Sequence, residues 1–140
     1  MEHLFQIMDE KDKILLNELK KDSKRSVQDL SKATKIPSTT VYNRIKDLEK
    51  EGIIKQYTVK LDNKKVGKVQ AFFEVTLNPS VNASEFLKKI KADEIYSVAG
   101  DYQFLIKSTF NDLGGVYSFT AQLQQAKADK VKTTIVLDEL

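Results

Sequence analysis

The sequence predicts an α+β protein of two parts, an N-terminal winged helix-turn-helix at residues 1–61 and a ferredoxin-like βαββαβ sandwich at residues 69–140. In the first part, three short segments carry apolar residues at helical spacing. In the second, strand-like alternation and helical spacing take turns, and two successive strand–helix–strand units are typical of a ferredoxin-like sandwich. Between the parts, residues 62–68 are expected to form a hinge.

Composition excludes several classes of protein. The chain has 140 residues and no cysteine, and its single histidine, His3, cannot build a histidine zinc site, so we expect no metal, cofactor or disulfide. No apolar run approaches the roughly 20 residues that span a bilayer, and the N-terminus lacks a signal peptide pattern. A cytoplasmic protein is expected, and Met8 is an alternative start that would make residues 2–7 an extension.

The first two helices have clear boundaries in the sequence. The first is expected at about residues 9–21, where Leu15 and Leu19 face inward and acidic residues at the start suit the helix dipole. Ser26 can cap a second helix that buries Leu30. The first helix is therefore expected to support the second.

A third helix follows a tight turn. Pro37 forces the residue before it into an extended conformation, so the second helix cannot continue through it. Ser38 is then expected to be the N-cap, and a buried stripe runs from Val41 to Leu48. Gly52 is placed to adopt the left-handed conformation that ends a helix.

The polar side of the third helix predicts a DNA-reading surface, and the alternative is an ordinary solvated face. Asparagine can pair with adenine and arginine with guanine, while hydroxyl groups contact phosphates or the thymine methyl group. Asp47 is also expected to face outward. The expected DNA contacts are Arg25, Ser26, Ser38, Thr39, Thr40, Tyr42, Asn43, Arg44, Lys46 and Lys55.

Charge supports the DNA interpretation. Residues 20–65 carry 13 Lys or Arg against 6 Asp or Glu, a net charge of +7, whereas residues 68–140 carry 8 against 9. Residues 53–60 alternate like a strand, and a short second strand or wing is expected to run through Leu61 and Asp62. Lysines on this wing either meet phosphates or simply guard a strand edge.

The second part is expected to dimerise. Phe72 and Phe73 make the first strand apolar on both sides, and such a strand is normally buried on both faces. Two helices cover only one face, so the other should pack on a second subunit. The expected elements are strands at 69–77, 95–98, 103–110 and 131–137, a helix capped by Ser84, and a helix starting at Asn111 or Asp112.

Three stretches of this sequence match a known family, namely Asp12 to Leu15, Asp22 to Arg25, and Thr40 to Ile54. In them the chain resembles the Lrp/AsnC, or feast/famine, transcription regulators of bacteria and archaea. The resemblance implies a RAM-type sensing domain that pairs into homodimers and higher homo-oligomers. A dimer would read a pseudo-palindromic site on double-stranded DNA, with recognition helices about 34 Å apart.

The same resemblance implies an amino acid effector, bound where dimers meet. The family's Gly-Asp-Tyr-Asp element reads Gly100-Asp101-Tyr102-Gln103 here, so Gln103 departs from it, and Thr133 stands at the family's threonine position. Asp101 would hold the effector's ammonium group. The alternative is that Gly100-Asp101 is only a hairpin turn that needs positive backbone dihedrals.

Two other classes of protein compete with a regulator as interpretations of this sequence. An enzyme lacks support, because the sequence shows no usable histidine, no cysteine, no phosphate-binding glycine loop and no nucleophile elbow. A winged helix that makes only protein contacts is the second rival. A DNA-binding assay at two salt concentrations separates these classes, since phosphate contacts weaken steeply with salt.

Overall fold

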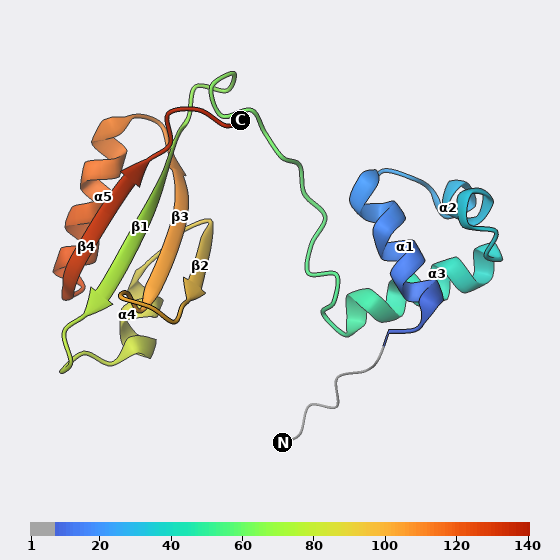
Figure 1. Cartoon of the computed structure of the whole chain (residues 1–140), viewed down its shortest axis with the longest axis horizontal. Coiled ribbons are helices and arrows are strands. Elements are labelled where there is room, and N and C mark those ends of the chain that lie inside the picture. The colour runs from blue at the N-terminus through green and yellow to red at the C-terminus, as the bar shows by residue number, and fades with distance from the viewer. Residues whose placement is uncertain (1–7) are drawn as a thin grey trace. The chain divides into compact units, whose positions relative to one another are not determined.

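The architecture comes from a computed structural model that describes residues 8–140 (Figure 1). The chain divides into two compact units, residues 1–59 and 60–140. Residues 1–7, which include His3 and the expected extension before Met8, lie outside the described residues.

The first unit contains three helices, α1 (Glu10–Lys21), α2 (Val27–Thr34) and α3 (Ser38–Lys50). The expected cap of α2 is confirmed. The Ser26 hydroxyl accepts a hydrogen bond from the Asp29 N–H, and the Asp29 carboxylate accepts one from the Ser26 N–H. Such a reciprocal capping box satisfies two backbone donors at the helix start.

The start of α3 differs from the prediction. Ser38 is not the N-cap but the first helical residue, and Pro37 occupies the N-cap without a side-chain hydrogen bond. The reason is that the Pro37 carbonyl already accepts from the Val41 N–H at 3.0 Å, so helical bonding begins one residue earlier. A proline ring, with φ of −54° here, is compatible with that position.

The end of α3 is as expected, but the wing strand is not formed. Gly52 has φ of 74°, and the N–H groups of Ile53 and Ile54 bond back to the Leu48 carbonyl. No strand is assigned between residues 53 and 62, all of which the structure describes. The strand expected from the alternation at residues 53–60 is therefore wrong for one subunit, which offers no second strand to accept its hydrogen bonds.

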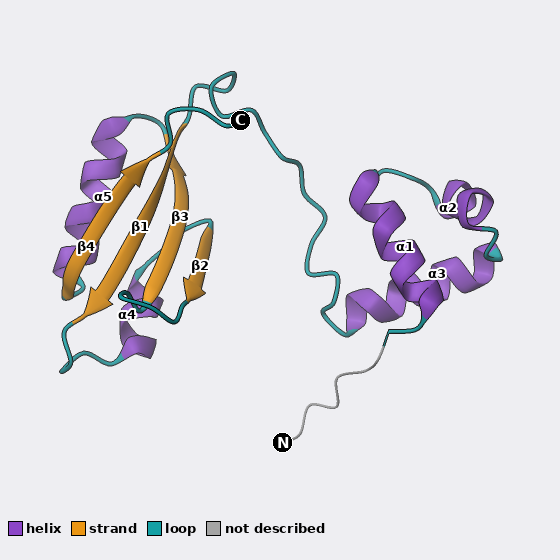
Figure 2. Cartoon of the chain, in the orientation of Figure 1, coloured by secondary structure: helices purple, strands orange, loops and turns teal. Residues whose placement is uncertain are grey.

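The second unit is a four-stranded antiparallel sheet with two helices (Figure 2). Its order, β2-β3-β1-β4, is that of a ferredoxin-like sandwich. Along the chain the elements are β1 (Val69–Leu77), α4 (Ala83–Lys89), β2 (Glu94–Ser97), β3 (Phe104–Phe110), α5 (Leu113–Gln125) and β4 (Ala128–Ile135).

Several boundaries in this unit differ from the prediction: β2 spans Glu94–Ser97 rather than 95–98, β3 starts at Phe104 rather than 103, and β4 ends at Ile135 rather than 137. The cap of α4 is Asn82 rather than Ser84, because the Asn82 side chain reaches the N–H groups of residues 84 and 85. Strand β4 starts at Ala128 rather than Val131. Its first residues include exposed charged side chains, which an edge strand tolerates. The helix expected to start at Asn111 or Asp112 is α5, which begins at Leu113 with Asp112 as its N-cap.

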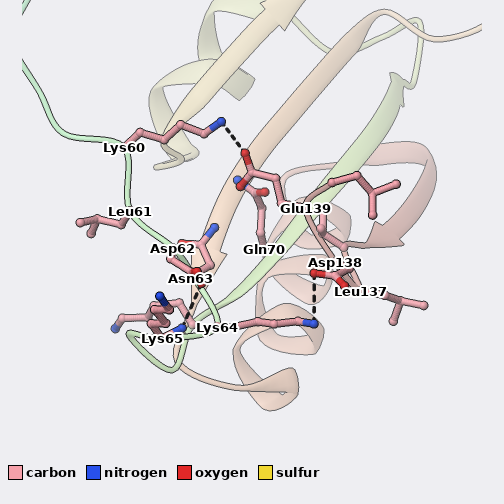
Figure 3. A pocket seen from close by; sticks show the side chains of 13 residues that line it. Lys60, Leu61, Asp62, Asn63, Lys64, Lys65, Gln70, Leu137, Asp138 and Glu139 are labelled. Atoms are coloured by element: carbon pink, nitrogen blue, oxygen red, sulfur yellow. Dashed lines mark hydrogen bonds and ion pairs between the residues drawn. The ribbon is translucent and has the colours of Figure 1, made fainter. Parts of the chain in front are cut away.

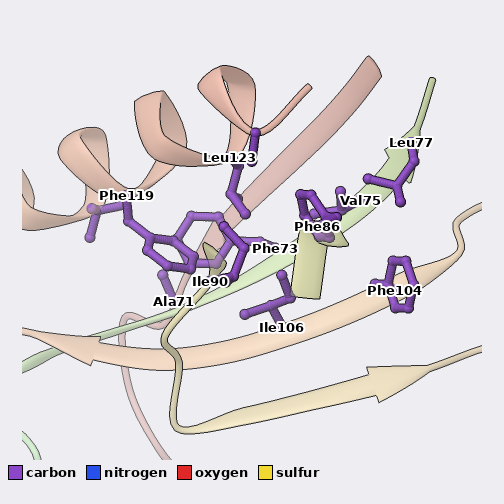
Figure 4. Packing of buried hydrophobic residues seen from close by; sticks show 12 residues of the cluster. Ala71, Phe73, Val75, Leu77, Phe86, Ile90, Phe104, Ile106, Phe119 and Leu123 are labelled. Carbon is purple, nitrogen blue, oxygen red and sulfur yellow. The ribbon is translucent and has the colours of Figure 1, made fainter. Parts of the chain in front are cut away.

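Both helices cover one face of the sheet and enclose the core (Figure 4). Alternate residues of β1 point into this core, with Phe73 fully buried at its centre. The Phe73 ring lies 4.7 Å from the ring of Phe119 and 5.9 Å from that of Phe110, both edge-on. Edge-to-face pairs of this kind are favourable beyond their buried area.

The segment expected to be a hinge lies against the C-terminal end of the second unit (Figure 3). Lys60 pairs with Glu139, and Lys64 pairs with Asp138 at 3.1 Å. Gly67 takes φ of 70° to turn the chain into β1. These ion pairs are exposed to solvent, so each contributes little to stability.

Candidate nucleic-acid interface and ligand-sensing loop

A polar stripe runs along one side of α3. Residues three, four and seven positions apart in a helix share a face. Thr39, Tyr42, Asn43 and Lys46 have this spacing, and all four are exposed, as is Asp47 beside them. The stripe combines a hydroxyl, a phenol, an amide and an ammonium group, which suits contacts to base edges and phosphates.

Two members of this stripe are organised before any partner binds. The Lys46 ammonium lies 4.9 Å from the centre of the Tyr42 ring. Interaction with Tyr42, and more weakly with Glu49, raises the pKa of Lys46. The Lys46 ammonium lies one turn from the Tyr42 ring, where a cation–π contact holds it.

Arg44 does not share this stripe, although an outward orientation was expected. Its guanidinium bonds to the carboxylates of Asp9 and Asp12 of α1, the second at 3.4 Å, and its side chain is 32% exposed. The Asp9 carboxylate raises the pKa of Arg44. The hydrogen bond from the Asp12 backbone, followed by that from Arg44, holds the pKa of Asp9 below its ordinary value.

Sequence spacing already contained the signal for this placement. Arg44 is three residues after Val41 and four before Leu48, both fully buried. It therefore lies beside the buried stripe rather than opposite it. The acidic residues at the start of α1, expected only to suit the helix dipole, also pair with Arg44.

The remaining expected contacts fall into three groups. Ser38 and Thr40 are half-buried at the start of α3, and Lys55 is exposed after its end. Arg25 pairs with Glu18 of α1. The Ser26 hydroxyl is engaged in capping α2.

The Gly100–Gln103 loop joins β2 to β3. Gly100 and Asp101 do lie in the loop of the antiparallel β2–β3 hairpin, as the alternative expects, but neither residue has the positive φ that was expected with it. A Cβ added at Gly100 would meet nothing within 4 Å in this subunit. Asp101 is exposed, and Tyr102 is half-buried.

Gln103 has a clear local role that the sequence did not reveal. Its side-chain oxygen accepts a hydrogen bond from the Leu77 N–H at 2.7 Å, and its own N–H bonds to the Val75 carbonyl. Gln103 therefore closes the end of β1, where a backbone donor would otherwise lack a partner.

One subunit does not bring this loop and Thr133 together. Thr133 lies in β4 opposite Phe73, with its hydroxyl 3.4 Å from that of Thr120. Strands β3 and β4 flank β1 on either side, which separates them by about 10 Å.

Among residues 8–140, no cluster of three or more potential metal ligands occurs. No helix in that range is long and apolar enough to cross a membrane.

Comparison with known families gives two matches that together cover most of the chain. A family model described as winged helix-turn-helix DNA-binding matches residues 8–55. A second, described as the Lrp/AsnC ligand binding domain, matches residues 70–140. An uncharacterized HTH-type transcriptional regulator of Pyrococcus furiosus is 33% identical over 132 residues, which cover 94% of this chain and 82% of the relative.

Solved structures agree with these matches. LrpC of B. subtilis has a TM-score of 0.78 and 28% identity, over 95% of this chain and 96% of that one. A transcriptional regulator of Neisseria meningitidis, solved as a complex with L-Met, has a TM-score of 0.78 at 22% identity, over 95% and 92% of the two chains. The second likeness is one of fold.

Proposed function

Since this chain belongs to the Lrp/AsnC family of DNA-binding transcriptional regulators, and is a regulator rather than an enzyme, we propose that it reads DNA through the exposed stripe of α3. The observation that carries the proposal is the stripe itself, four exposed polar residues at helical spacing on the third helix of a helix-turn-helix. Thr39, Tyr42, Asn43 and Lys46 are the proposed base-contacting or phosphate-contacting residues. As a DNA-binding regulator, the protein is proposed to act in the cytoplasm.

Substitution Asn43→Ala tests the assignment. An asparagine that pairs with adenine contributes about 1–3 kcal/mol of discrimination, so we expect the preference at one base pair of each half-site to disappear. Sequences selected from a random duplex pool report this directly. Asn17→Ala, an exposed asparagine of α1, is the matched control. If both variants select the wild-type sequence, Asn43 does not read a base.

The proposed DNA-binding species is a homodimer, or a larger homo-oligomer, on a pseudo-palindromic site. The uncovered face of the sheet supports this. Phe72 lies at the centre of that face, with Leu105 nearby on β3 and Tyr96, 47% exposed, beyond it on β2. Apolar side chains on an uncovered sheet face favour burial against a second subunit.

We further propose that the second unit binds an amino acid at the Gly100–Gln103 loop. The exposed Asp101 carboxylate is suited to an ammonium group, and Gly100 leaves open space beside it. The relative from Neisseria meningitidis was solved with L-Met. Because Thr133 is remote from this loop within one subunit, a site that uses both residues has to draw them from different subunits.

Substitution Asp101→Asn is expected to lower amino acid affinity at least tenfold, because it removes the charge that pairs with the ammonium group while preserving shape. Calorimetric titration with a panel of amino acids that includes L-methionine measures this. Glu85→Gln, an exposed carboxylate of α4, is the control for general loss of negative charge. Equal affinities in wild type and Asp101→Asn would contradict the assignment.

A further inference from the structure

The bond between Arg44 and α1 is poorly suited to an arginine that reads bases. Such an arginine needs its planar fork free to meet the guanine edge. Here the fork is bonded to Asp9 and Asp12, and the side chain is two-thirds buried. To reach a base, Arg44 would have to leave two carboxylates unpaired.

Asp9 connects the start of α1 to α3 with its two oxygens. Oδ1 accepts the Asp12 N–H at 2.9 Å and caps α1, while Oδ2 accepts from Arg44. A carboxylate held at one oxygen by a helix terminus has little freedom at the other. The Arg44 guanidinium is therefore fixed to the backbone of α1 and not only to a mobile side chain.

Two sets of contacts hold α3 within the first unit. The cluster of the first unit contains Val41 and is joined by Ile45, but Leu48 is not part of it. Leu48 instead lines a small hollow of about 270 Å³ together with Asp9 and Arg44. The later turns of α3 are therefore held by the buried Leu48 side chain, which is 3% exposed, and by the pairing of Arg44 with Asp9 and Asp12.

We infer that Arg44 is a positioning residue, whose pairing with Asp9 and Asp12 sets the angle at which the exposed stripe of α3 enters the DNA groove. This inference rests on the proposed function of the stripe. Hydrogen bonds to base edges depend steeply on distance and direction. A recognition helix that pivots about its first turns would weaken all of its base contacts together.

The double variant Asp9→Asn/Asp12→Asn tests this role without touching any residue of the stripe or Arg44 itself. Asparagine caps a helix as well as aspartate does, so α1 keeps its start. We expect the ratio of specific to non-specific affinity to fall about five- to tenfold, comparable to the loss of one good base contact. The loss should be spread over all positions of the site, unlike that of Asn43→Ala.

The measurement is sequence selection from a random duplex pool by the full chain, with binding to the selected and a scrambled duplex titrated at several salt concentrations. The salt slope should stay unchanged, since no phosphate contact is removed. In Arg44→Lys, the ratio of specific to non-specific affinity should fall by the same factor. The loss should again be spread over the site and not confined to one base position. Should the double variant lose helical circular dichroism, Arg44→Lys, which leaves both aspartates and the cap of α1 in place, gives the comparison.

Two results would overturn the inference. One is an unchanged or improved ratio in the aspartate variants, because freeing Arg44 would then favour binding. The other is a preference lost at one base pair only in Arg44→Lys, which marks a direct contact. If the wild-type chain selects no DNA sequence, the proposed function is wrong as well. If the wild type selects a sequence and the variants select it equally well, only this inference is wrong.

Discussion

Substitution Phe73→Ala is expected to lower the free energy of unfolding of the second unit by about 3–5 kcal/mol, the usual cost of deleting a fully buried phenylalanine side chain. Phe73 is 0% exposed. Its ring contacts Phe110 and Phe119, so the cavity would open between β1, β3 and α5. Rigid packing on three sides limits how far the site can collapse.

Chemical denaturation followed by near-ultraviolet circular dichroism measures the effect, with the first unit as an internal reference. Tyr117→Ala removes an aromatic side chain that is 68% exposed on α5, and it should change the stability of this unit by less than about 1 kcal/mol. Similar losses in the two variants would show that Phe73 is not at the centre of the core.

Patterns of period two and 3.6 were enough to predict most of the fold. Strand β1 was placed at its observed ends, since alternation of buried residues from Val69 to Leu77 is a local property of the sequence. The failures at Ser38 and Ser84 have one cause. A neighbour, Pro37 in one case and Asn82 in the other, occupies the cap position first.

The candidate site was less accessible to sequence reasoning because its decisive contacts join residues far apart in the chain. Arg44 and Asp9 are 35 residues apart, and Gln103 reaches Leu77 across 26. A pattern can identify a polar face, but it cannot tell which polar groups are already bonded. The prediction of a wing strand is wrong for a related reason, because this segment has no partner strand within the subunit.

The uncovered sheet face was identified from the sequence, but the polar groups that surround its apolar centre were not. The alternation of β1 predicts that Phe72 lies on the face opposite the core. The structure places it there, half-buried beside Lys107 and Thr134. Ion pairs between Glu74 and Lys132 and between Lys107 and Glu94 lie on this face as well. A partner surface would therefore need polar groups around an apolar centre, the usual composition of a protein interface.

Substitution Phe72→Glu is expected to separate the subunits and to weaken binding to a full pseudo-palindromic site by about 10²- to 10⁴-fold, because the second recognition helix is no longer tethered to the first. Binding to an isolated half-site should be unaffected. A glutamate at this position stands opposite Lys107, so the isolated subunit should tolerate it. Buried in the proposed interface, the glutamate charge would lose its solvation without an opposite charge that is known to pair with it.

Sedimentation at several concentrations gives the oligomeric state, and titration of full-site and half-site duplexes gives the two affinities. Phe72→Leu is the matched control, since it keeps an apolar side chain and should retain both the dimer and the full-site affinity. A Phe72→Glu chain that stays dimeric would exclude this face as the interface. If the variant is monomeric yet binds the full site as tightly as wild type, the tethering argument fails, and each helix-turn-helix unit reads its half-site alone.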